Sequence, residues 1–528
     1  MKRLFSMGDF TELMGAASAG HLGNVERLLK MGQDPNARRL SGRTALMYAA
    51  FSGSVPVVKK LVEVGAEIDA RDNKGWTALM VAIDQGYFEV AKALVELGAD
   101  TNVSTDRNQT PLMLAAGLGK MDIAVYLLEN GADPAIARVD GFSVLMAACQ
   151  GNQLKLAKIL VEQYNCDVNT IADDGWSALS YAIQYADDKC VLYLLENGAE
   201  PRWENESQNE LIEKIIENGN IEIIGKILDT GANIETRLRR GWTPFMVAVE
   251  KSSIETVEYL ISKGANIDAT TKEGFTPIII AAEMGRKEVV DILLDNEANF
   301  MASSTGGYTS LMAASAGGLV DFVKFLIDNN EEPTYSTRSG WTPIAFATQN
   351  GQVDVIEILI EKGAEIDPQD DKGYTPLLIA ILKDDVKCAR KLIELGANLE
   401  IPDKEGWTPL ISAASRGLKE ITDVLVEKGA DTKYRRPNGY GLLMAASVGG
   451  LTDLVKLALE EGSDINEIDG DSVTALIYAA ENGNLDTVKF LIEHGADPKI
   501  TDNQGNNALE CARAVGQPEV IEFLEDYY

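Results

Sequence analysis

The chain has 528 residues, of which 45% are hydrophobic and 24% charged, a composition typical of a folded protein with an apolar core. Its formal net charge is −33, which argues against direct binding of nucleic acid or an anionic membrane surface and favours a protein partner with a basic surface. No stretch reaches the roughly 20 apolar residues of a membrane span, and the opening MKRLFSMGDFTELMG lacks the apolar segment of a secretion signal, so we expect a cytoplasmic protein without membrane insertion.

The predicted elements recur with a fixed period. One position, usually glycine, returns every 33 residues, with a single step of 34 between Gly141 and Gly175. It is occupied by Asp9, Gly42, Gly75, Asn108, Gly141, Gly175, Gln208, Gly241, Gly274, Gly307, Gly340, Gly373, Gly406, Gly439, Ser472 and Gly505. We therefore predict a short N-terminal extension, residues 1–8, followed by a single solenoid of sixteen repeats over residues 9–528.

Each repeat predicts two helices and a loop. In the repeat that starts at Gly241, the Thr243 hydroxyl is placed to cap a first helix that begins at Pro244. A second helix with apolar residues at helical spacing ends at Gly264, and the polar run 265–274 predicts a hairpin-like loop. Fifteen of the sixteen repeats carry alanine seven positions after the glycine position, which indicates close helix packing there.

The unit with TPL before the first helix and GAD or GAN after the second resembles the ankyrin repeat, over about residues 9 to 528. This resemblance implies an all-α solenoid of stacked helix pairs in a curved arc, with hairpin loops projecting at the concave side. The family's usual TPLH histidine is absent, and methionine takes its place in half of the repeats, which we interpret as core packing. These methionines are Met14, Met47, Met80, Met113, Met146, Met246, Met312 and Met444.

Catalytic and metal-binding chemistry has little material in this sequence. The two histidines, His21 and His494, lie far apart in the chain, so a histidine-based triad or zinc site is not expected. The acidic run Asp464–Asp471 does not fit a calcium-binding loop, and five irregularly spaced cysteines suit reduced packing thiols. We expect no catalytic residue, no metal and no cofactor.

An aromatic residue follows the glycine position in eleven of the sixteen repeats. Seven consecutive repeats carry it without interruption, at Trp242, Phe275, Tyr308, Trp341, Tyr374, Trp407 and Tyr440. In ankyrin repeats this position commonly faces a bound partner. Two interpretations stay open: the rings pack one repeat onto the next, or they form a series of rigid anchors for a long protein partner.

The repeat at about 208–240 is atypical, because it lacks the glycine, the threonine cap and the aromatic residue, and Ile215 replaces its alanine. We expect its helices to pack farther apart. It is flanked by Trp203 and by a basic loop tip that contains Arg237, Arg239 and Arg240. This irregularity predicts either a bend or a recognition site. Elsewhere Glu297 and Asn330 occupy the position of the glycine that caps the second helix.

These features favour a non-enzymatic scaffold or inhibitor that presents a concave, acidic, aromatic-lined surface to a protein partner. The alternative is a structural spacer or self-assembling unit with no single client. The sequence leaves the oligomeric state open.

Overall fold

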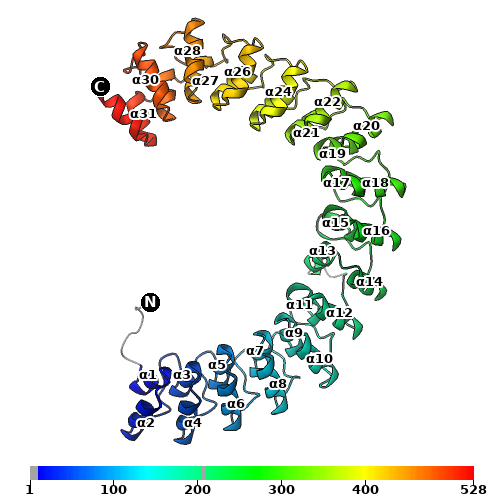
Figure 1. Cartoon of the computed structure of the whole chain (residues 1–528), viewed down its shortest axis with the longest axis vertical. Coiled ribbons are helices and arrows are strands. Elements are labelled where there is room, and N and C mark those ends of the chain that lie inside the picture. The colour runs from blue at the N-terminus through cyan, green and yellow to red at the C-terminus, as the bar shows by residue number, and fades with distance from the viewer. Residues whose placement is uncertain (1–9, 204–207) are drawn as a thin grey trace. The chain divides into compact units, whose positions relative to one another are not determined.

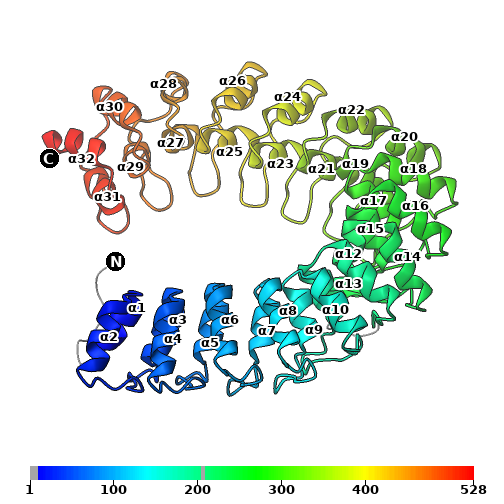
Figure 2. The same ribbon diagram turned by 60° about the horizontal axis from the view of Figure 1, so that its bottom comes forward.

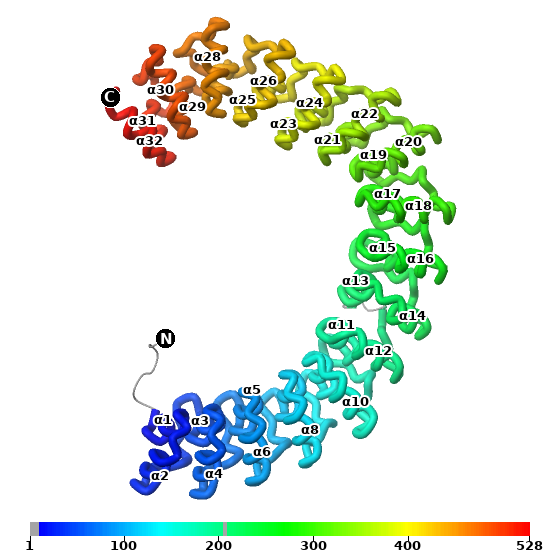
Figure 3. The backbone as a smooth tube through the Cα atoms, viewed as in Figure 1, coloured from blue at the N-terminus to red at the C-terminus, as the bar shows by residue number. Residues whose placement is uncertain are grey.

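The computed structural model describes residues 10–203 and 208–528, which form thirty-two α-helices and no β-strand. The helices come in sixteen successive pairs, each a first helix and a second helix joined by a short turn (Figures 1 and 3). The predicted all-α stack of helix pairs is therefore confirmed. Contacts divide the chain into two compact units, Met1–Arg239 with Lys251–Ala265, and Arg240–Glu250 with Asn266–Tyr528. The single solenoid over residues 9–528 stays a prediction.

The helices of the two units have similar lengths. The first helices of the first unit are α1 (Glu12–Ser18), α3 (Ala45–Ser52), α5 (Ala78–Gln85), α7 (Pro111–Gly117), α9 (Val144–Gln150), α11 (Ala178–Tyr185) and α13 (Asn209–Asn218). Its second helices are α2 (Leu22–Lys30), α4 (Val55–Glu63), α6 (Phe88–Glu96), α8 (Met121–Glu129), α10 (Leu154–Glu162), α12 (Asp188–Glu196), α14 (Ile221–Asp229) and α16 (Ile254–Ser262).

The first helices of the second unit are α15 (Pro244–Lys251), α17 (Pro277–Glu283), α19 (Ser310–Gly317), α21 (Pro343–Gln349), α23 (Pro376–Leu382), α25 (Pro409–Ser415), α27 (Leu442–Val448), α29 (Ala475–Glu481) and α31 (Ala508–Val515). Its second helices are α18 (Lys287–Asp295), α20 (Val320–Asp328), α22 (Val353–Glu361), α24 (Val386–Glu394), α26 (Lys419–Glu427), α28 (Thr452–Glu460), α30 (Leu485–Glu493) and α32 (Pro518–Leu524). Short 3₁₀ turns lie at Arg239–Gly241 and Glu525–Tyr527.

Two layers of helices enclose the core of each unit. Within a unit, the first helices pack on one another along one layer and the second helices form the other (Figure 1). The alanine seven positions after the glycine position lies where a first helix meets its neighbours, and Ala82, Ala281 and Ala446 are fully buried. A small side chain there lets the helix axes approach, which explains the repetition of alanine.

Capping side chains fix the ends of the helices much as the sequence predicts. The Thr243 hydroxyl accepts a hydrogen bond from the Met246 N–H at 3.3 Å, and α15 begins at Pro244. Gly264, after α16, has a φ of +86°, and Glu297 adopts the same left-handed conformation with a φ of +62°. Residues other than glycine rarely adopt this backbone conformation. Glu297 therefore stores strain at the end of α18.

The atypical repeat departs from the others in how it is anchored. Gln208, in the glycine position, is buried, and its side-chain amide donates a hydrogen bond to the Gly175 carbonyl at 3.0 Å. The same side chain accepts one from the Ser180 hydroxyl at 3.2 Å. Ile215 is buried where the other repeats have alanine, and α13 and α14 touch over less of their length than the other helix pairs of the first unit. This weaker contact agrees with the expectation that the two helices pack farther apart.

Loops join each second helix to the next first helix, and those before α23, α25, α27 and α29 extend past the first helices on one side of the second unit (Figure 2). At the loop tips the backbones of successive repeats touch. The Lys404 N–H donates to the Lys372 carbonyl at 3.0 Å. A Cβ added to Gly373, whose φ is +85°, would lie 2.8 Å from the Lys404 nitrogen. The repeated glycine is therefore required both by its φ and by the neighbouring loop.

A second set of hydrogen bonds connects the loops near the ends of the second helices. The Asn36 side chain accepts from the Glu67 N–H at 2.7 Å and donates to the Gly65 carbonyl at 3.0 Å. Asn102, two repeats later, makes the same pair of bonds: its side chain accepts a backbone N–H at 2.7 Å and donates to a carbonyl at 2.9 Å. Asp69 holds the equivalent position between them and only accepts, from the Asp100 N–H at 3.1 Å.

Replacing the loop glycine in two different repeats separates the effect of its left-handed φ from the effect of its contact with the neighbouring loop. We expect Gly439→Ala, at a φ of +87° with the nearest atoms at 3.5 Å, to cost about 1 kcal/mol of stability through backbone strain alone. Gly373→Ala has a similar φ and also overlaps the next loop, so we expect it to cost about 1–3 kcal/mol more. Guanidinium denaturation of both variants measures the difference, and equal losses would show that the loop contact does not constrain this position.

Asp69→Asn is expected to stabilise the protein by about 0.5–1.5 kcal/mol, because the new amide donates to the Gly98 carbonyl as Asn36 does to Gly65. Burial raises the pKa of Asp69, and the neighbouring Asp100 adds to this rise against the opposing backbone hydrogen bond. The ionised carboxylate therefore opposes folding at neutral pH, and this cost disappears as the pH falls toward the unfolded value. Denaturation of wild type and variant from about pH 7 down to about pH 4 should show an advantage that shrinks at the acidic end, toward the unfolded pKa of aspartate. The reverse change, Asn102→Asp, should lower the stability of the protein. If the stability of this control is unchanged, the explanation is wrong.

Candidate functional site

Seven aromatic residues lie at the entrances of successive first helices in the second unit. We call Trp242, Phe275, Tyr308, Trp341, Tyr374, Trp407 and Tyr440 the aromatic row. Six of them are half-buried, whereas Tyr440 keeps only 5% of its surface exposed. Most of the row therefore presents part of each ring to solvent while the rest packs on the protein.

The backbone of the loop fixes where each ring of the row stands. The Trp407 N–H donates to the Asp403 carboxylate at 2.9 Å, and the Phe275 N–H donates to the Thr271 hydroxyl at 3.1 Å. In the same turn the Thr271 N–H donates to the Phe275 carbonyl at 2.9 Å. These bonds hold the residue on both sides of its Cα, so the ring leaves a rigid turn that leads directly into the capped first helix.

Ring contacts join neighbouring members of the row. The Phe275 and Tyr308 ring centres are 5.7 Å apart, and Tyr308 meets Phe346 edge-on at 5.0 Å. Trp341, which lies in the same repeat as Phe346, packs against it at 5.1 Å. Such offset and edge-on pairs add roughly 0.5–1.5 kcal/mol each beyond the area that they bury. Packing between repeats is thus one role of these rings.

An arginine stacks on the row at its C-terminal end. The Arg436 guanidinium carbon lies 3.9 Å from the centre of the Trp407 ring and 5.7 Å from that of Tyr440. Its Nη2 donates to the Glu405 carbonyl at 3.0 Å, which ties the loop tip of one repeat to that of the next. Trp407 and Tyr440 are themselves 5.6 Å apart. Arg436 therefore holds the two aromatic residues together.

Sequence reasoning missed the aromatic residues that receive the row. Phe346 and Tyr478 lie six positions after the glycine position, on α21 and α29, and Tyr440 meets Tyr478 edge-on at 5.4 Å. The first unit shows the same arrangement, because Phe142 meets Tyr181 edge-on at 5.2 Å. Aligning the repeats on the glycine position places all of these receiving rings in one column, so the signal was present in the sequence.

Burial moves the pKa values of the phenols of the row still further above neutral pH. It raises the pKa of Tyr308, and the nearby Glu283 carboxylate raises it further. Burial likewise raises the pKa of Tyr374 and of Tyr440, although a hydrogen bond with Ser415 and the Arg436 charge oppose the rise at Tyr440. These hydroxyls are therefore neutral and do not add charge to the surface.

The residues that flank the atypical repeat are not equally accessible. Trp203 is 3% exposed, which leaves almost none of its ring for a partner. It lines a shallow hollow with Thr230 and Gly231, and none of the described lining residues belongs to the basic tip. Arg237, Arg239 and Arg240 are exposed, and Arg239 forms an ion pair with Glu210 at 2.7 Å. Their role in recognition stays a prediction.

Metal-binding clusters and membrane-spanning helices are absent from the described parts of the chain. Over residues 10–203 and 208–528, no group of three or more histidine, cysteine, aspartate or glutamate side chains is arranged to hold a metal ion. Within the same ranges every helix is too short or too polar to cross a membrane. All five cysteines are free thiols.

Comparison with known proteins bears on the repeat itself. A family model described as ankyrin repeats (3 copies) matches residues 13–105, 112–205, 212–304, 298–370, 363–436 and 442–527, which together cover nearly the whole sequence. No curated protein matches the chain.

The stacking of Arg436 on Trp407 is expected to contribute about 0.5–1 kcal/mol of coupling. A double-mutant cycle with Trp407→Leu and Arg436→Gln, followed by chemical denaturation, measures this coupling as the departure from additivity. The matched cycle pairs Arg436→Gln with Trp341→Leu, two repeats away, and should be additive. Equal coupling in both cycles would mean that the effect does not come from the stacked pair.

Proposed function

Because the chain belongs to the ankyrin repeat family, whose repeats generally mediate protein–protein interaction, we propose that it is a non-enzymatic scaffold or inhibitor that binds a protein partner along the aromatic row. The partner lies across the row and the adjoining ends of the first helices. The observation that supports this most directly is a series of half-buried rings in six consecutive repeats, from Trp242 to Trp407, which follow hydrogen-bonded turns such as those at Phe275 and Trp407.

The geometry of the row suits recognition because the rings are already ordered. Aromatic side chains that are fixed before binding lose little conformational entropy on contact and dominate the energy of many protein interfaces. Packing against Phe346 and Arg436 supplies this order without covering the rings completely. The packing role and the binding role are therefore compatible in one residue.

The chemistry of the partner follows from charge. The chain carries a net charge of −33, and near the row Glu250 and Glu283 end first helices with exposed or half-exposed carboxylates. A partner with a basic surface is attracted and oriented by this field, whereas nucleic acid is repelled. The proposal accordingly includes a basic protein partner in the cytoplasm and no direct contact with nucleic acid.

The test is capture of a partner from native lysate by wild type and by the variant Trp242→Ala, Trp341→Ala, Trp407→Ala. The control variant is Trp76→Ala, Trp176→Ala, which removes two tryptophans from the same position in repeats of the first unit. Circular dichroism establishes that both variants are folded. We expect the captured protein to be lost from the first variant and retained by the control, because only the first removes anchors from the row.

The captured protein is then purified and titrated calorimetrically against wild type at low and high salt. We expect a basic protein whose affinity falls steeply with salt. Equal capture by both variants, or a partner that binds independently of salt, contradicts the proposal. Absence of any captured protein would instead favour the structural spacer.

A further inference from the structure

The second-helix layer of the second unit contains an apolar groove that the aromatic row does not use. It lies between α18 and α20 and encloses a hollow of about 360 Å³. Val290 and Leu294 of α18 line one side, and Phe322 and Phe325 of α20 line the other. We call this hollow the α18/α20 groove.

In the first-helix layer opposite the groove, a glycine lets two helices approach closely. A Cβ on Gly317, in α19, would overlap the Ala282 carbonyl oxygen of α17, so the ends of these two first helices meet backbone to backbone. In this pair of repeats α17 and α19 pack closely, while α18 and α20 hardly touch. The groove lies between these two loosely packed second helices.

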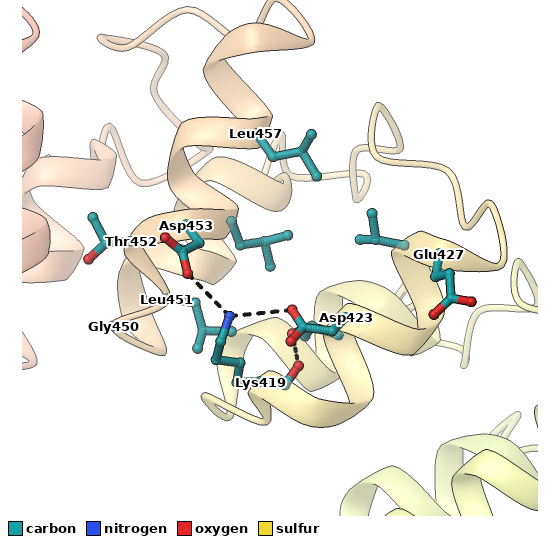
Figure 4. Close-up of a pocket in the computed structure, with 11 residues that line it drawn as sticks. Lys419, Asp423, Glu427, Gly450, Leu451, Thr452, Asp453 and Leu457 are labelled. Atoms are coloured by element: carbon teal, nitrogen blue, oxygen red, sulfur yellow. Dashed lines mark hydrogen bonds and ion pairs between the residues drawn. The ribbon is translucent and has the colours of Figure 1, made fainter.

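The same construction occurs four repeats later. Gly449 meets the Ala414 carbonyl in the same way, and a hollow opens between α26 and α28 (Figure 4). There Lys419 bridges Asp423 at 3.5 Å and Asp453 at 3.2 Å. We call this hollow the α26/α28 groove, and it serves as an internal comparison because its residues align one by one with those of the α18/α20 groove.

The two grooves differ in what lines them. Leu457 in the α26/α28 groove holds the position that Phe325 holds in the α18/α20 groove. The Phe325 side chain is 38% exposed. Phe325 is held in place by Phe322, whose parallel ring centre lies 6.1 Å away, and by Phe300, which meets it edge-on at 5.1 Å. An ordered aromatic ring exposed inside an apolar hollow is typical of a binding site for an apolar side chain.

The rim of the α18/α20 groove is acidic. Lys287 forms an ion pair with Asp291 at 3.0 Å, and Asp321 carries a second carboxylate at the rim. Two carboxylates thus face one ammonium group, so the rim keeps a net negative charge within a chain of net charge −33. An occupant with a lysine or arginine beside its apolar residues complements this rim, and an acidic occupant is repelled.

The dimensions limit the size of the occupant. Both α18 and α20 have nine residues, so each is about 13 Å long, which corresponds to two or three turns of a bound helix. We propose that the α18/α20 groove binds a short amphipathic helix of a partner protein, which inserts a bulky apolar side chain beside Leu294 and Phe325 and places a basic side chain at Asp321. This interaction uses the second-helix layer and is independent of the aromatic row.

The probe is a library of random peptides of about 16 residues, displayed on phage and selected against the full chain; its length spans the groove with flanking residues. We expect enriched peptides to carry apolar residues three or four positions apart with a lysine or arginine nearby. Their affinities are measured by fluorescence anisotropy for wild type and variants. Phe325→Leu, which imitates the α26/α28 groove and preserves an apolar core, should weaken binding by about tenfold or more.

The charge is tested by Asp321→Asn, which should weaken binding by roughly threefold. Its matched control, Asp453→Asn in the α26/α28 groove, should leave affinity unchanged. Enrichment of no peptide, equal affinity for wild type and Phe325→Leu, or selection of acidic peptides overturns the proposal. So do peptides that are lost from the Trp242→Ala, Trp341→Ala, Trp407→Ala variant but retained by Phe325→Leu, because they bind the aromatic row. A dimer in light scattering that Phe325→Leu abolishes overturns it by identifying a second copy as the occupant.

Discussion

Contact between the backbones of successive repeats is the constraint on which the rest of this structure depends. At the loop tips, glycine in the left-handed conformation lets the loop of one repeat lie against the next, as Gly373 does with Lys404. In the first-helix layer, alanines such as Ala281 bring helix axes close together. At most a methyl group stands between repeats at these places, so their spacing is set largely by main-chain atoms and hydrogen bonds, and everything else is arranged around that spacing.

The aromatic row shows how a packing position serves recognition as well. A ring that entered the core completely would be rigid but inaccessible, as Trp203 is, and a ring on a loose loop would be accessible but disordered. The row lies between these extremes because its backbone is tied down by side chains such as Asp403 and its rings lean on Phe346, Tyr478 or Arg436. Order and partial exposure are produced by the same contacts.

The sequence predicted the parts of the fold that depend on local chemistry. Thr243 and Pro244 correctly predicted where the first helix α15 begins, and Gly264 predicted where the second helix α16 ends. Capping involves only residues within a turn of each other, so the sequence alone is sufficient. The glycine column also predicted the repeat register. For the candidate site, the sequence found the members of the row but could not decide how much of each ring its neighbours cover.

What the sequence could not supply depends on contacts one repeat away. Tyr440 packs against Trp407 and Tyr478 of the neighbouring repeats, and the column of rings that contains Phe346 is visible in the sequence although its contact with Tyr308 is not. Likewise Gly317 reads as an ordinary turn residue, although it lies where α19 meets the backbone of α17, and the loose packing of α18 against α20 has no signal in the sequence. Helix propensity predicts each helix well, but how closely the helices of successive repeats pack depends on the assembled stack.

The hydrogen bonds between repeats also have a kinetic consequence. They join residues only 28 to 38 positions apart, as between Ser180 and Gln208 or Gln153 and Ala115, although the chain has 528 residues. Loop-closure entropy is therefore incurred in small steps, and relative contact order stays low despite the length. Folding of such a chain can therefore nucleate at any well-capped pair of neighbouring repeats and spread outward one repeat at a time.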